Sequence, residues 1–334
     1  MATQRDVAEL AGVHFMTVSR AINTPERVAD ETRERILRAI EETGYVPNLI
    51  GRGLRVARSR VIGLVLAGLE PYALQTLRGV TRTARARGYS VLVAHSESST
   101  DIESEQLTLM RSQRVEGVVL LPHAENPANA HKTQAAGTHV VVVSPTVGPC
   151  AVDQVRGETR PGVQAMTRYL IGECGHRELY MLSGPDWSPS ARERELGFTD
   201  ALRAASLDPE GHVVRGDYSI ATGYDAAMRV LRERPETTAI VAASDMIARG
   251  ASAAARELGL RVPDDLSIAS VGEVGDLYGG APFFTTASQP LLAIAGAATD
   301  LLLDRIEGIE TGPRREVVVD ASVEVHRSTG RVRG

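Results

Sequence analysis

The sequence predicts a small all-α domain at the N-terminus and a larger α/β body whose two lobes are each built on a doubly wound parallel sheet. Three observations lead to this prediction. Short helical segments with a glycine turn fill residues 1–46, a basic segment follows, and from Val61 onward short apolar runs alternate with helical stretches. A chain of 334 residues with 43% hydrophobic content is large enough for two or three packed cores.

The N-terminal domain begins with two short helices around a tight turn. Thr3 followed by Asp6 is typical of a capping box, and Gly12 ends the first helix. The inner face of this helix is expected to hold Val7, Ala8, Leu10 and Ala11. The second helix covers residues 15–23, and its 3.6-residue period buries Val18, Ala21 and Ile22. Two helices joined in this way are typical of a helix-turn-helix motif.

A third helix completes the predicted bundle. It is expected to begin at Asp30, which is a good N-cap residue, and to end at Gly44. Its buried residues are expected to be Ile36, Leu37 and Ile40.

The outer face of the second helix has an unusual composition for an exposed surface. In place of Glu and Lys it carries Met16, Thr17, Ser19, Arg20 and Asn23. Hydroxyls, an amide, a guanidinium and a bulky apolar group suit phosphates, base edges and thymine methyls. The pattern favours DNA binding, with a plain helical subdomain as the alternative.

Charge and apolar content exclude several classes of protein. The net charge of −5 argues against a protein that coats nucleic acid, although residues 1–60 carry +2 and the remainder −7. Neither a signal peptide nor a run of eighteen apolar residues is present, so we expect a cytoplasmic protein without membrane insertion. Cys150 and Cys174 are expected to be packing residues, with no metal site and no cofactor.

Residues 47–60 form a predicted hinge between the domain and the body. The stretch 48–60 contains four arginines and no acidic residue, which suits contact with phosphate better than burial in a core. A solvated basic linker is the alternative.

The body is expected to contain two similar lobes. The strands predicted for the first lobe are residues 61–68, 89–96, 115–122 and 138–145, with helices near 73–88, 101–114 and 128–137. Those predicted for the second are residues 178–184, 211–217, 239–244 and 266–272. We place 61–157 and 290–316 in the first lobe, and 158–289 and 317–334 in the second. Such sheets bind ligands at the carboxyl ends of their strands, which predicts a cleft between the lobes.

Several strings of residues now point to one family. In the N-terminal domain they are 6–8, 11–13, 17–20 with Asn23, 31–36 and 44–48; in the body they are Gly79, 113–117, 175–177, 190–194, 197–198, 285–286 and 289–290. The N-terminal strings resemble the headpiece of the LacI (lactose-repressor) family of bacterial transcription factors, and the body resembles the core of that family, which is similar to periplasmic sugar-binding proteins. The resemblance covers essentially the whole chain.

The resemblance implies a set of DNA-binding residues. Phe15, Met16 and Arg20 would read bases in the major groove, with Arg20 the expected partner of guanine. Leu54 matches the hinge leucine that enters the minor groove at the operator centre. Contacts to phosphates and flanking groups are implied for Thr3, His14, Thr17, Ser19, Asn23, Val28, Thr32, Tyr45, Asn48 and Arg55.

The resemblance also implies an effector site in the cleft. Arg194 would pair with ligand hydroxyls or a carboxylate, and Tyr218 would stack on a ligand ring. Further cleft positions are Ser244, Gln289 and, on loops leaving strands of the first lobe, Tyr72 and His123. The alternatives are a surface arginine for Arg194, a loop aromatic for Tyr218 and a solvated loop histidine for His123.

The chain departs from the family pattern at several positions. His14 stands where a serine N-cap is expected, and Gly51 and Gly53 stand where helix formers are more usual. The aspartate pair after Val271-Gly272 is replaced by residues 273–275, and the Asp-Asn near the lobe boundary by Glu158-Thr159. The loss of a hydroxyl-binding aspartate weakens the expectation of a standard hexose.

The expected function is that of a homodimeric repressor. It would bind a pseudopalindromic double-stranded DNA operator and respond allosterically to a small-molecule effector, by default a sugar or related polar metabolite. The alternative from another class is a solute-binding or carrier protein without DNA function. An enzyme is disfavoured because the sequence has no P-loop, zinc-protease or nucleophile-elbow motif.

Overall fold

The computed structural model describes residues 2–45, 58–69, 71–122, 127–143, 151–272 and 282–332. The chain divides into two compact units, residues 1–59 and 60–334, which we call the headpiece and the core. The predicted site residues Asn48, Leu54, Arg55 and His123 lie outside the described residues, as do Cys150 and residues 273–275.

The headpiece contains α1 (Gln4–Leu10), α2 (Phe15–Asn23), the short 3-10 helix η1 (Pro25–Arg27) and α3 (Asp30–Thr43). The capping box is present, since the Thr3 and Asp6 side chains each accept a hydrogen bond from the other residue's backbone N–H. Gly44 ends α3 with a left-handed φ of 61°. The buried apolar residues of the headpiece are Val7, Ala8, Ala11, Val18, Ile36 and Ala39.

Three details of the headpiece differ from the prediction. Leu10, the last residue of α1, is 49% exposed. Leu37 is 55% exposed, because the buried stripe of α3 follows Ile36 and Ala39 and leaves Leu37 outside it. Asp30 is the first residue of α3 rather than its cap; the N-cap is Ala29, which has no side-chain hydrogen bond.

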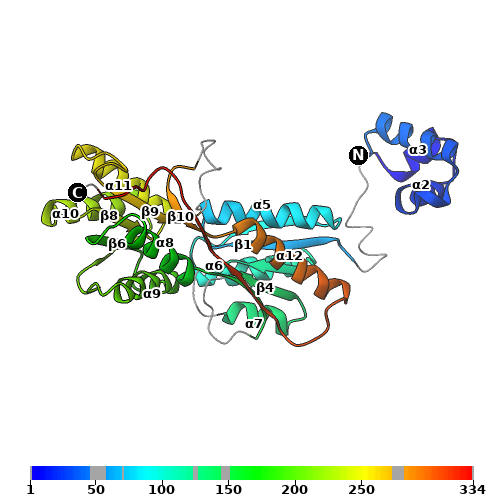
Figure 1. Cartoon of the computed structure of the whole chain (residues 1–334). Helices are drawn as coiled ribbons and strands as arrows, with labels where there is room; N and C mark the ends of the chain where they lie inside the picture. Colours follow the sequence, from blue (N-terminus) through cyan, green and yellow to red (C-terminus); the bar gives the residue numbers. More distant parts are fainter. Residues whose placement is uncertain are drawn as a thin grey trace. The chain divides into compact units, whose positions relative to one another are not determined.

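The first lobe of the core is a parallel sheet with helices on both faces (Figure 1). Its strand order is β11-β5-β4-β3-β1-β2. The strands are β1 (Val61–Leu66), β2 (Ser90–His95), β3 (Gly117–Leu120), β4 (His139–Val143), β5 (Asp153–Glu158) and β11 (Glu316–Asp320). Helices α5 (Pro71–Ala86) and α12 (Leu291–Glu307) cover one face, and α6 (Thr100–Ser112) and α7 (Ala128–Ala135) cover the other.

The second lobe repeats this design with strand order β12-β10-β9-β8-β6-β7. Its strands are β6 (Leu179–Ser183), β7 (Val213–Arg215), β8 (Ala239–Ala242), β9 (Ser267–Val271), β10 (Thr285–Ser288) and β12 (Ser322–Glu324), of which only β12 is antiparallel to its neighbour. The helices are α8 (Arg160–Gly172), α9 (Pro189–Ala204), α10 (Ile220–Glu233) and α11 (Asp245–Glu257). Two lobes with mainly parallel sheets confirm the predicted fold class.

The eight predicted strands are all present, whereas β5, β10, β11 and β12 were not predicted. One lobe boundary also needs correction. β11 pairs in parallel with β5, so residues 316–320 belong to the first sheet and not, from 317 onward, to the second lobe. The chain passes between the sheets at Ala321, directly before β12.

None of the helices in the described segments is both long and apolar enough to cross a membrane.

The packing of α10 on α11 gives a stability prediction. A Cβ added at Gly250 would overlap the carbonyl oxygen of Ile220 and the backbone nitrogen of Tyr224, which cannot move aside easily. We expect Gly250→Ala to lower the free energy of unfolding of the core by about 1–3 kcal/mol, seen as a lower melting temperature. Gly172→Ala is the matched control, because this helical glycine has open space around it; a melting temperature no lower for Gly250→Ala than for Gly172→Ala would contradict the prediction.

Candidate functional site

Helix α2 presents a mixed apolar and cationic face to solvent. Val18, which is fully buried, fixes the orientation of the helix on the headpiece core. On the outer side Phe15 and Met16 are 39% and 43% exposed, and Arg20 is exposed. Within the described residues no ion pair engages Arg20, so its guanidinium is available to a ligand.

His14 caps α2 in place of the expected serine. Its Nδ1 accepts a hydrogen bond of 3.3 Å from the backbone N–H of Met16, and its ring lies 4.6 Å from the ring of Phe15. The departure from the family pattern therefore keeps a capped helix and adds an aromatic ring beside Phe15.

The other predicted DNA-binding residues of the headpiece differ in their exposure and contacts. Thr17, Ser19, Val28 and Thr32 are partly exposed, and Asn23 ends α2. The Thr3 hydroxyl is already used in the capping box, and Tyr45 packs against the headpiece core. The face formed by Phe15, Met16 and Arg20 is thus the part of the predicted set that is most open to a partner.

In the core, Arg194 projects from α9 to the carboxyl edge of the second sheet. Its Nη1 donates a hydrogen bond of 2.6 Å to the carbonyl oxygen of Ala243, directly after β8. Its Nε is buried and has no hydrogen-bond partner among the described residues. A buried donor without a partner is costly, so Arg194 has unused capacity for an acceptor on a ligand.

Tyr218 is held rigidly beside Arg194. The guanidinium carbon of Arg194 lies 5.8 Å from the centre of the Tyr218 ring, a cation–π distance. The ring packs directly on Gly184, where any Cβ would overlap it, and the hydroxyl lies 3.1 Å from Ser188 Oγ at the start of α9. The loop after β7 therefore places an aromatic face next to a cation at the end of the sheet.

Ser244 and its neighbour Asp245 have structural partners. Ser244 caps α11 by accepting a hydrogen bond of 3.3 Å from the Ile247 N–H. Asp245 is buried and accepts a hydrogen bond from Ser270 Oγ. The predicted polar position at Ser244 is therefore already occupied by a helix cap.

The first lobe contributes Tyr72, which lies in the first turn of α5 and not on a loop as expected. Burial raises the pKa of Tyr72 to about 12, against a weaker opposing effect of the positive charge of Arg194. The charge of Arg194 acts on Tyr72, so the two residues lie in the same region of the core. Gln289, which is 5% exposed, follows β10 and packs against Gly157 of β5.

One polar group of this region was missed by the sequence reasoning. Ser183 ends β6, and its Oγ is buried without a hydrogen-bond partner in the described part of the chain. The signal was present, because Ser183 stands at the carboxyl end of a strand that the apolar pattern predicted.

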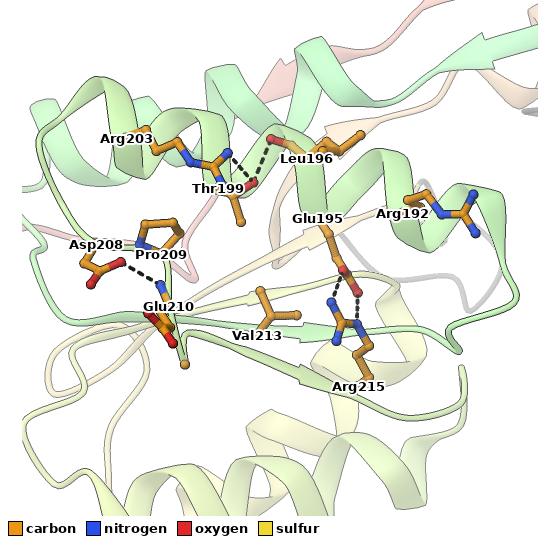
Figure 2. Close-up of a pocket in the computed structure, with 11 residues that line it drawn as sticks. Arg192, Glu195, Leu196, Thr199, Arg203, Asp208, Pro209, Glu210, Val213 and Arg215 are labelled. Carbon is orange, nitrogen blue, oxygen red and sulfur yellow. Dashed lines mark hydrogen bonds and ion pairs between the residues drawn. The ribbon is translucent and has the colours of Figure 1, made fainter.

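A hollow lies between α9 and the edge strand β7 (Figure 2). It has a volume of about 640 Å³ and is lined by three arginines, Arg192, Arg203 and Arg215. Figure 2 shows Arg215 paired with both carboxylate oxygens of Glu195, at 2.9 and 2.7 Å. Because Arg215 is already paired and the groove is open to solvent, the edge near Arg194 is the stronger candidate for a ligand.

The described segments contain no group of three or more His, Cys, Asp or Glu side chains placed to hold a metal ion.

Comparison with known proteins covers both units of the chain. Residues 3–48 match the family described as bacterial regulatory proteins, lacI family, and residues 59–309 match the periplasmic binding proteins and sugar binding domain of the LacI family. The HTH-type transcriptional repressor PurR of Edwardsiella ictaluri (strain 93-146) is 33% identical over 331 residues, 98% of this chain and 94% of that protein. PurR of Klebsiella pneumoniae subsp. pneumoniae is 32% identical over the same length and coverage.

Solved structures agree with these matches. The lac repressor dimer bound to operator and the anti-inducer ONPF has a TM-score of 0.83 and 27% identity, covering 98% of this chain and 99% of that one. The transcriptional regulator CelR–cellobiose complex has a TM-score of 0.71 and 30% identity, covering 98% and 100%.

The raised pKa of Tyr72 predicts a pH dependence. A phenol whose pKa is raised from 10 to about 12 in the folded state favours folding below pH 10, and this contribution is lost as the pH rises toward 12. The melting temperature of the wild-type chain should therefore fall more steeply with pH than that of Tyr72→Phe. The range to measure is about pH 9.5 to about pH 11.5, which brackets the ordinary tyrosine pKa of about 10. If the melting temperatures of the two proteins fall equally with pH over this range, the hydroxyl of Tyr72 is not buried.

Proposed function

The chain belongs to the LacI family of bacterial regulatory proteins, and from this premise we propose that it represses transcription as a homodimer on a pseudopalindromic operator, under the control of an effector held between its lobes. As a DNA-binding repressor of this family it is a cytoplasmic protein and not an enzyme, as the sequence predicted. The single observation that carries the proposal is the exposed face of α2 formed by Phe15, Met16 and Arg20.

The chemistry of this face suits the major groove. A helix fits the groove, and an unpaired arginine can donate two hydrogen bonds to the O6 and N7 atoms of guanine. Phe15 and Met16 offer apolar surface that suits thymine methyls, and His14 stacks close to Phe15 at the end of the helix that approaches the bases first in this motif. Thr17, Ser19, Asn23 and Thr32 would fix the register through phosphates, with weaker contributions from Thr3, Val28 and Tyr45.

The dimer and the hinge are part of the same proposal. The lac repressor of similar structure is a dimer bound to operator, and two headpieces related by a two-fold axis would read two half-sites. Leu54 would enter the minor groove at the operator centre, with Asn48 and Arg55 on the backbone; this assignment rests on the family resemblance alone.

For the effector we propose a planar nitrogen heterocycle, such as a nucleobase or nucleoside, in place of the sugar that was the default expectation. Tyr218 offers a fixed aromatic face, and Tyr72 offers a second aromatic group from the opposite lobe. Arg194 Nε and Ser183 Oγ supply two buried polar atoms that still need partners. Aromatic faces with a few convergent polar groups suit a flat ring that carries hydrogen-bonding atoms at its edge.

The carboxylates at this edge disfavour a sugar. Adjacent hydroxyls of a hexose are commonly held by a free carboxylate, whereas Asp245 at this edge already accepts a hydrogen bond from Ser270. The curated relatives named above, at 33% and 32% identity, are PurR repressors. The structural relative that is bound to a sugar, the CelR–cellobiose complex, is 30% identical.

The DNA-reading role of Arg20 can be tested on duplexes selected from a random pool by the wild-type chain. Arg20→Ala should cost about 1–3 kcal/mol of binding free energy at one operator position and relax the base preference there. Arg38→Ala, which removes an exposed arginine from α3, is the control and should leave the preference at every position intact. Unchanged affinity and preference in Arg20→Ala would remove Arg20 from the base-reading set.

The effector role of Arg194 can be tested by thermal shift with nucleobases, nucleosides and sugars including cellobiose. We expect a nucleobase or nucleoside to raise the melting temperature of the wild-type chain, and Arg194→Ala and Arg194→Gln to lose this shift while still binding the selected duplex. Arg192→Ala, on the same helix but in the groove of Figure 2, should keep it. A shift by sugars alone would reject the proposed ligand class, and a normal shift in both Arg194 variants would clear this residue of its role.

A further inference from the structure

Arg60, the first residue of the core, is held at both ends of its backbone. Its N–H donates a hydrogen bond of 2.6 Å to Glu116 Oε1, and its carbonyl oxygen accepts one of 2.9 Å from the N–H of Ser90. The residue has a left-handed φ of 55°, which is unfavourable for a long side chain such as that of arginine. Such a conformation persists where the surrounding contacts fix it.

The side chain of Arg60 is held as well. Its guanidinium carbon lies 4.8 Å from the centre of the Tyr89 ring, and its Nη1 lies 3.6 Å from Glu307 Oε1. Two backbone hydrogen bonds, one aromatic contact and one ion pair therefore fix the residue at which the chain from the headpiece enters the core.

Glu307 connects Arg60 to a second arginine. Arg87 Nη2 donates a hydrogen bond of 2.6 Å to Glu307 Oε2, and Arg87 Nη1 donates one of 2.8 Å to Asp304 Oδ1. The hydrogen bond from Arg87 holds the pKa of Glu307 below its usual value. Glu307 is therefore a charged bridge between Arg87 and Arg60, and we call these residues together with Tyr89 and Glu116 the Arg60 cluster.

The Arg60 cluster stands at the ends of two helices that begin beside the candidate effector site. α5 begins with the turn that carries Tyr72 and is followed by Arg87, and α12 follows Gln289 and ends at Glu307. The two helices pack side by side (Figure 1). At their contact a Cβ on Gly79 would lie only 2.5 Å from Ala295 Cβ, so the pair is locked together in its middle.

We propose that Arg60 is a positioning residue for operator binding. Through the Arg60 cluster the paired helices α5 and α12 set the direction of the chain where it leaves the core, so that a displacement at Tyr72 or Gln289 reaches the segment leading to the headpiece. This inference rests on the proposed function and adds to it the route by which the core acts on operator binding.

Exposure of the ion pair argues for a geometric role over a stabilising one. The side chains of Arg60 and Glu307 are 51% and 23% exposed, and pairs of this kind contribute little to folding stability. The rival explanation is that Arg60 simply contacts a DNA phosphate. The two explanations make opposite predictions for Glu307, because removal of an acidic charge should strengthen a purely electrostatic attraction to DNA.

The test uses the full chain and a duplex selected from a random pool by the wild-type protein. Glu307→Gln and Arg60→Met should each weaken binding to this duplex by about 3- to 30-fold, with an unchanged dependence on salt. The double variant should bind the duplex almost as tightly as whichever single variant has the lower affinity, because both changes break the same link. Arg60→Lys, which keeps the charge but loses the planar group over Tyr89, should also bind more weakly.

The matched control is Glu316→Gln. It removes one carboxylate from the same lobe, where Glu316 of β11 pairs with Arg156 at 2.7 Å, and it should bind the duplex as tightly as the wild-type chain. Melting temperature and active fraction are measured for every variant. Weaker duplex binding with both of these values unchanged supports the positioning role of Arg60.

Three results would overturn the inference. The first is binding by Glu307→Gln that is as tight as, or tighter than, that of the wild-type chain. The second is a salt slope reduced by about 1 in Arg60→Met, which marks a lost phosphate contact. The third is weaker binding that is matched by an equal loss of active fraction. Failure of the proposed function is a separate outcome, seen when the wild-type chain selects no preferred duplex.

Discussion

The close contact of α5 with α12 is the constraint on which the rest of the core depends. With no side chain at Gly79, the two helices approach until Ala295 and the backbone of Leu292 fill the space, so neither helix can slide without the other. Both helices run between the interlobe edge, where Tyr72 and Gln289 lie, and the opposite end of the first sheet, where Glu307 meets Arg60. A rigid pair of this kind transmits displacement instead of absorbing it.

The second lobe provides the chemistry to which this pair can respond. Parallel strands bring their carboxyl ends to one edge, and there Arg194 and Ser183 keep buried polar atoms without partners while Tyr218 is packed on Gly184. In the groove along β7, by contrast, Arg215 is satisfied by Glu195. Unsatisfied polar atoms beside a fixed ring mark the place where a ligand gains most, because it supplies hydrogen bonds that the protein itself lacks.

Local patterns were sufficient for most of the fold. Eight strands and the helices of the headpiece were predicted because their apolar periods are set by burial on one or both faces. β11 and β12 have exposed residues at alternate positions, and β5 contains charged residues, so none of the three is a continuous apolar run. Their identity as strands depends instead on pairing with neighbours far along the chain. The family resemblance supplied Arg194, Tyr218 and the N-cap position of His14. That the His14 ring itself makes the cap bond, and that Arg60 has the contacts described, depends on three-dimensional geometry that no spacing reveals.

In the proposed mechanism, one free energy of coupling links the candidate effector site to the operator-binding face. By thermodynamic linkage, an effector that changes operator affinity by some factor must have its own affinity changed by the same factor when operator is bound. The direct measurement is titration calorimetry of the effector with the free chain and with the chain saturated by its selected duplex. We expect the ratio of the two dissociation constants to differ from one and to equal the factor by which the effector changes duplex affinity. A ratio of one would show that the two sites are not coupled.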